Sequence, residues 1–164
     1  MTEKPSPEEV VRWQRRLASQ ANNRAWSLSE QPVRTAAEDE EMLNAAHAAM
    51  YFWSIVGDAN TQTHAAQLLA HTYAMVKQPS AAARHLEKCL PVLAGESAKP
   101  WERALAHAVA ANVASASGNA ADHTRHYQEA TRLTAALENA EERALIEATL
   151  RVLPVPASVR AIVD

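Results

Sequence analysis

The chain has 164 residues, of which 48% are hydrophobic, and carries a net charge of −3 from 16 basic and 19 acidic side chains. This length and apolar content suffice for one domain whose core needs neither disulfides nor a structural metal. Both signs of charge are mixed without a long run, which argues against nucleic acid and membrane surfaces as partners. Residues 1–9 lack an apolar stretch and no later stretch is as long as a membrane span, so we expect a cytoplasmic protein.

Helix starts and stops can be located from local signals along an alanine-rich chain that favours helix over sheet. Capping residues followed by glutamate predict starts at Ser6, Thr35 and Asn139, while prolines and a further Asn–Asp pair suit the first turns of other helices. Three glycines, Gly57, Gly95 and Gly118, each follow a long apolar-periodic segment and are expected to end helices in the left-handed conformation. These signals predict seven helices, near residues 7–29, 36–56, 61–77, 80–94, 100–117, 120–136 and 140–153.

The predicted domain spans residues 1–153, and residues 154–164 form a C-terminal tail because Pro154 and Pro156 cannot continue a helix. Apolar Val159, Ile162 and Val163 are expected to pack on the last helix of the same chain, with a partner as the alternative. Pro91 falls inside the fourth predicted helix and should kink or loosen its last turn.

Residues 77–89 and 118–130 share a turn, a helix start, a bulky residue and a small residue at an offset of about 41 positions. This pattern resembles the second-helix half of a tetratricopeptide repeat. The resemblance covers residues 62–136, and it implies a tetratricopeptide-like superhelix of antiparallel helix hairpins. The positions that carry it are Leu69, Ala70, Tyr73, Ala82, Leu86 and Cys89, supported by Tyr127 and Ala130, whereas Ala110, Ala111, Ala114 and His123 depart from the pattern.

The resemblance implies a scaffold or adaptor whose first helices line a concave surface that receives a peptide or protein segment. On this surface we expect partner contacts from His64, Gln67, His71, Met75, Asn112 and Ser115, with Leu105 and Ala108 beside them. The surface lacks lysine, and only Asn112 matches the polar residues with which family members clamp a carboxylate end, so a chaperone-tail clamp is not expected.

Histidines suggest an alternative, a small metal-binding or enzymatic domain that uses His47, His64, His71 or His107 with Glu40. However, no histidine–glutamate metal signature occurs, and no glycine-rich phosphate loop, nucleophile elbow or catalytic cysteine motif is present. We therefore expect a protein that is not an enzyme and has no cofactor or metal.

Polar side chains at Glu40, Asn44, His47 and Tyr51 lie one turn apart and are expected to form a partly exposed helix face. Trp53 and Trp101 are expected to fill the core between alanines. Trp13 and Trp26, together with the tail, offer a further alternative, a homodimer. Cys89 is expected to behave as a small hydrophobic side chain.

Overall fold

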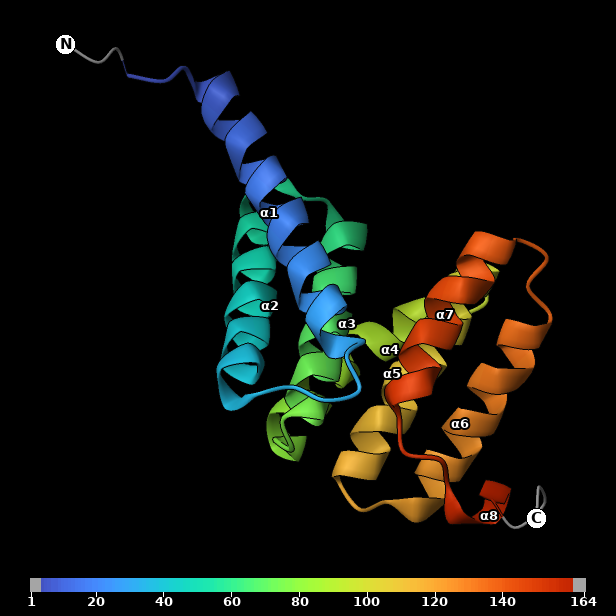
Figure 1. The fold of residues 1–164 in the computed structure, drawn as a ribbon. Helices are drawn as coiled ribbons and strands as arrows, with labels where there is room; N and C mark the ends of the chain where they lie inside the picture. Colours follow the sequence, from blue (N-terminus) through green and yellow to red (C-terminus); the bar gives the residue numbers. More distant parts are fainter. Residues whose placement is uncertain (1–3, 161–164) are drawn as a thin grey trace.

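The computed structural model describes residues 4–160 and has an all-α fold in which consecutive helices pack as hairpins (Figure 1). All seven predicted helices are present within the described residues, and a single further turn follows them. Their bounds are α1 Pro7–Ser29, α2 Ala36–Val56, α3 Ala59–Met75, α4 Pro79–Leu93, α5 Pro100–Ala116, α6 Ala120–Ala135, α7 Ala140–Val152 and α8 Ala157–Arg160.

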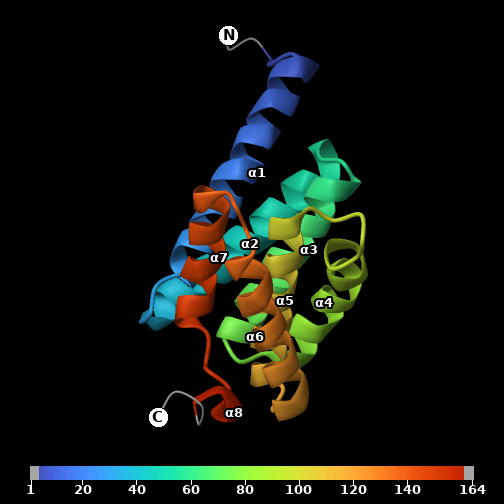
Figure 2. The same ribbon diagram turned by 90° about the vertical axis from the view of Figure 1, so that its right-hand side faces the viewer.

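The hairpins α1–α2, α3–α4 and α5–α6 follow one another across the molecule in Figure 1, and Figure 2 views the same row from the side of α6 and α7. Successive hairpins are joined by contacts of α2 with α3 and of α4 with α5, and also by contacts of α1 with α3, α3 with α5 and α5 with α7. The four helices of this second series, α1, α3, α5 and α7, are called the inner layer below. The second helices of the three hairpins, α2, α4 and α6, are called the outer layer below. The first turns of α1 project past the neighbouring ends of α2 and α3 in both views.

Small residues allow the inner helices to approach one another closely. Ala70 and Ala74 of α3 and Ala104 of α5 are fully buried in one core cluster, with Leu105 and Val109 filling the space between them. Leu69, Ala82 and Cys89, which carry the repeat pattern, are also buried. The small and large residues of the repeat pattern therefore lie where helices contact one another.

The predicted capping residues lie at the helix starts. Ser6 and Thr35 each form a reciprocal capping box with the glutamate three residues on, and Asn139 accepts from two backbone N–H groups of α7. The helix α3 begins at Ala59, two residues earlier than predicted, because Asp58 caps it by accepting from the N–H of Thr61 at 2.8 Å.

The expectation of a left-handed stop is correct at Gly118, whose φ is +72°, but wrong at Gly57, whose φ is −91°, and at Gly95, which does not have a positive φ. Gly57 is instead a site of close approach, because a Cβ there would lie 2.4 Å from Thr61 Oγ1 and 2.6 Å from the carbonyl oxygen of Trp53. The left-handed residue after α3 is Lys77, with φ of 60°, which no sequence signal indicated.

The described part of the C-terminal segment, residues 154–160, packs on its own chain, as expected, but against α6. Ser158 and Thr124 share a hydrogen bond of 3.0 Å between their hydroxyls, and His123 Nε2 lies 2.9 Å from the carbonyl oxygen of Pro154. Ile162 and Val163 lie outside the described residues.

The helix α4 continues through Pro91 to Leu93. Within residues 4–160 no helix combines the length and apolar character needed to cross a membrane.

Candidate ligand-binding cavity and groove

A cavity of about 440 Å³ lies between the four helices of the inner layer. The last two turns of α1, the middle of α3, the first turns of α5 and one residue of α7 supply its walls. The lining residues are Asn22, Asn23, Trp26, Ser27, Glu30, His64, Gln67, Trp101, Leu105 and Leu145.

Two tryptophans of the cavity are each stacked on a histidine of α3. The ring of Trp26 lies on that of His71, with centroids 5.2 Å apart and planes inclined by 25°. The ring of Trp101 lies on that of His64 at 5.5 Å and 11°. Each stack covers one face of an indole and fixes its orientation, so both aromatic walls are held in place before any ligand arrives. Trp101 and Trp53 are partly buried against core clusters, as expected.

A buried carboxylate holds the imidazole of His64 in place at the cavity wall. Glu102 Oε1 accepts a hydrogen bond from His64 Nε2 at 2.9 Å, and its Oε2 accepts from the backbone N–H of Lys99 at 2.8 Å. Burial alone would raise the pKa of Glu102, but the bonds from Lys99 and His64 outweigh it, so its pKa lies below the ordinary value. An ionised Glu102 therefore fixes both the start of α5 and the imidazole that stacks on Trp101.

Gln67 of α3 contributes an amide that has no hydrogen-bond partner in the protein. The residue is 1% exposed, and neither Oε1 nor Nε2 meets a donor or acceptor within the described residues. A buried amide without partners is unfavourable by about 1–3 kcal/mol, and most buried polar groups in folded proteins are paired. Gln67 is thus an unsatisfied polar group at the wall of the cavity.

Glu30 stands at the other side of the cavity, at the C-cap of α1. Burial raises the pKa of its carboxyl group, and the nearby charge of Arg151 opposes this only in part. No ion pair or side-chain hydrogen bond of Glu30 occurs among the described residues, so its charge is only weakly compensated.

Two smaller hollows continue the cavity along α1 and α3. The first, of about 250 Å³, shares Asn22, Asn23 and His64 with the cavity, and it also touches Trp53 and Thr61. The second, of about 220 Å³, shares Trp53 and Thr61 with the first and ends beside Arg15. Neighbouring hollows share lining residues, and together they follow α1 from Glu30 to Arg15. The three are called the α1–α3 groove below.

Of the residues predicted to contact a partner, some line the cavity and the others do not. His64 and Gln67 line the cavity, as does Leu105. His71 and Asn112, in contrast, are fully buried beneath it, where Asn112 Nδ2 donates to Nδ1 of His71 at 3.1 Å and to its carbonyl oxygen at 3.3 Å. Burial first, and the charge of Arg34 second, lower the pKa of His71 to about 3, so its ring is neutral. These two residues join α3 to α5 and cannot reach a partner at the surface.

Met75 and Ser115 lie away from the cavity. Met75 packs near the opposite end of α3 against a cluster formed by Ala108, Ala130 and Leu153, so Ala108 is also a core residue. Ser115 is half-buried in the last turns of α5 and borders neither the cavity nor its two extensions. Met75 differs from the expected surface because Ala130 of α6 and Leu153, at the end of α7, pack over this part of α3.

Sequence reasoning missed the contribution of α1. Asn22, Asn23, Ser27 and Glu30 lie outside the repeat match, and the sequence suggests Trp26 only as part of a homodimer surface, whereas it lines the cavity. One signal was available: Trp26, Asn23 and Glu30 are spaced three and four residues apart and so share a helix face. Nothing local to α1 indicates that this face is turned toward α3 and α5.

The histidines of the metal alternative have separate partners. His47 Nε2 lies 2.7 Å from the hydroxyl of Tyr73, and His107 Nδ1 lies 2.9 Å from His126 Nδ1 on α6. Glu40, Asn44, His47 and Tyr51 form an exposed face of α2, as expected. Among residues 4–160 no three histidine, cysteine or acidic side chains gather where they would hold one metal ion.

Comparisons of this chain with protein-family models, with curated proteins and with solved structures find no match.

Proposed function

We propose that this protein is a non-enzymatic scaffold that binds a peptide or protein segment in the α1–α3 groove, with one side chain anchored in the cavity. The observation that carries the proposal is the cavity itself, with two oriented tryptophans and the unpartnered amide of Gln67 at its wall. Apolar walls with a few directed polar groups are typical of ligand sites. A bound segment that supplied the missing hydrogen bonds would remove the cost of burying Gln67.

The dimensions of the groove favour an extended segment over a compact ligand. From Arg15 to Glu30 the helix α1 rises by about 22 Å, at 1.5 Å per residue. An extended peptide covers that distance with about seven residues. Asn22 and Asn23, which lie between the cavity and the first hollow, are placed to hydrogen-bond with the backbone of such a segment.

We further propose that the array is of the tetratricopeptide type. This assignment is supported by the burial of Leu69 and Ala70 in the first helix of the better repeat and of Ala82 and Cys89 in the second. It is also supported by His71 and Asn112, which are separated by the repeat offset and contact each other in adjacent inner helices. Equivalent positions of stacked repeats meet in this way.

A peptide-display selection against the full chain, followed by calorimetric titration of the selected peptides, tests the groove assignment. Ser27 is exposed and lines the cavity, so Ser27→Trp should fill the cavity and abolish binding without disturbing the core. The matched control is Ser80→Trp on α4 of the outer layer, which should leave affinity unchanged. Peptides that bind the Ser27→Trp variant as tightly as the original chain would contradict the groove assignment.

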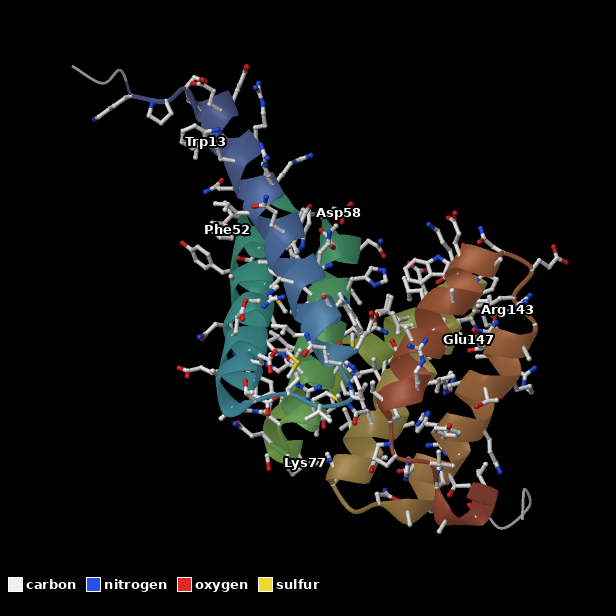
Figure 3. The ribbon with its side chains drawn as sticks, viewed as in Figure 1. Trp13, Phe52, Asp58, Lys77, Arg143 and Glu147 are labelled. Atoms are coloured by element: carbon white, nitrogen blue, oxygen red, sulfur yellow. The ribbon has the colours of Figure 1, made fainter. Side chains whose placement is uncertain are left out.

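Self-association through the projecting end of α1 is a second candidate function. Trp13 and Leu17 are one turn apart, 58% and 46% exposed, and Figure 3 shows Trp13 on the same side of the molecule as Phe52. Glu9 and Arg16 are seven residues apart and flank this stripe on one side. When two such helices pair antiparallel about a two-fold axis, matching flanks meet, so Glu9 of each copy faces Arg16 of the other. The surface is thus complementary to a second copy of itself.

Sedimentation velocity over a range of concentrations tests this candidate. Arg16→Glu places like charges opposite each other and should convert a dimer to a monomer. Arg15→Glu makes the same change of charge on the other side of α1 and should not. A chain that remains monomeric at all concentrations, or equal effects of the two substitutions, would rule out this pairing.

A further inference from the structure

The charged side chain that lines the cavity is acidic. Among the described residues that line it there is one carboxylate, Glu30, and there is no lysine or arginine. Glu30 forms no ion pair in the described part of the chain, and the pKa of its carboxyl group is raised by burial. A cation in the cavity would stabilise the ionised carboxylate, as Arg151 does only in part from outside.

The end of α1 adds to this negative potential. The helix ends at Ser29, its last turn contains no basic residue, and Glu30 is its C-cap. The carbonyl groups at a helix C-terminus carry about half a negative charge, which favours a nearby cation. The carboxylate and the helix end therefore act on the same side of the cavity.

The walls suit a flat cation. Trp26 and Trp101 are held in place by their stacks on His71 and His64. Indoles bind cations through the negative faces of their rings, and arginine does so with its planar guanidinium group, which also has five N–H groups to donate. The side-chain carbonyls of Asn22 and Asn23 and the carboxylate of Glu30 can accept these donors.

We propose that the cavity receives the guanidinium group of an arginine in the bound segment, an inference that rests on the groove being the binding site. The apolar stem of the arginine passes Leu105 and Leu145, and its planar head lies among the two indoles and Glu30. The opposite end of the groove has no such preference for a cation, because Arg15 and Asp58 both line it and their charges oppose each other. The bound segment is therefore oriented with its arginine toward the C-terminal end of α1.

A pair of small probes that differ in charge but hardly in shape tests this assignment. N-acetyl-arginine amide carries the guanidinium group, and N-acetyl-citrulline amide carries the neutral ureido group in its place. In a nitrogen–proton NMR titration of the full chain, the arginine probe should shift the indole signals of Trp26 and Trp101 and leave that of Trp13 in place. The citrulline probe should bind about tenfold more weakly. No shift with the arginine probe, or equal affinity for both, would overturn the proposal.

Substitutions at and near the cavity should change the affinity for the arginine probe in opposite directions. Glu30→Gln should weaken the arginine probe about five- to tenfold, as expected for a lost cation–carboxylate contact, whereas Glu40→Gln on the exposed face of α2 should have no effect. Arg151→Gln removes a competing cation and should strengthen binding. Equal effects of the two glutamate substitutions would also overturn the proposal. Selected peptides that lie in the groove without needing an arginine would refute this inference alone, while peptides bound to the outer layer would refute the proposed function.

Discussion

Replacing Gln67 by methionine should make the protein more stable and a poorer binder. Methionine has nearly the shape of glutamine but no amide, so the substitution keeps the packing of α3 and removes two buried polar atoms that lack partners. The expected gain in the free energy of unfolding is about 1–2 kcal/mol, since an unsatisfied buried amide is unfavourable by about 1–3 kcal/mol. For a chain of this size that gain raises the midpoint of thermal unfolding by about 2–8 °C.

Urea unfolding followed by circular dichroism measures this change, with an unchanged m-value showing that the unfolded reference is unaltered. The matched control is Gln62→Met, an exposed position of the same helix, where a change within about 0.5 kcal/mol is expected. The same Gln67→Met protein should bind selected peptides less tightly. A destabilised variant would show that the amide is satisfied in the folded protein, and a stabilised variant with full affinity would remove Gln67 from the binding site.

Three further outcomes follow from individual residues. The pKa of buried His71 is about 3 in the folded protein and about 6.5 when unfolded. The free energy of unfolding should therefore fall as the pH decreases from about 6.5 toward 3, and this group contributes up to about 1.4 kcal/mol per pH unit. Urea unfolding at pH 7 and 5 measures this slope, which His71→Gln should reduce. Gly57→Ala should destabilise by about 1–3 kcal/mol, since its Cβ would meet the carbonyl oxygen of Trp53 at 2.6 Å; an unchanged urea midpoint would argue against that contact. Burial raises the pKa of the Cys89 thiol to about 12, so iodoacetamide should label the protein only in denaturant, and rapid labelling of the native protein would contradict its burial.

Local chemistry explains why the helices could be predicted. The start of α1 depends on Ser6 and Glu9, which bond to each other's backbone N–H groups three residues apart, so the signal and the structure occupy the same few residues. The left-handed residue after α3, Lys77, could not be predicted in this way, because lysine has no preference for that conformation. It adopts it where the N–H groups of Lys77 and Gln78 donate to the carbonyl oxygens of Ala74 and Tyr73 and so close the end of the helix.

The candidate site was only partly predictable, for a physical reason. His64 and Gln67 follow from the position of α3 in the repeat, which indicates its inner face. Burial of His71 depends on α1 and α5 covering that face, and this is a property of three helices distant in sequence. The separation of 41 residues between His71 and Asn112, equal to the repeat offset, was the one available signal that they contact each other rather than a ligand.

The most direct test of the central claim is a chemical-shift map of the isotope-labelled full chain titrated with a selected peptide. If the segment binds in the α1–α3 groove, the largest changes should fall at Asn23, Trp26, His64 and Trp101, and the outer helices α4 and α6 should change little. Changes concentrated on α4 and α6, with the indole signals of Trp26 and Trp101 unmoved, would contradict the central claim.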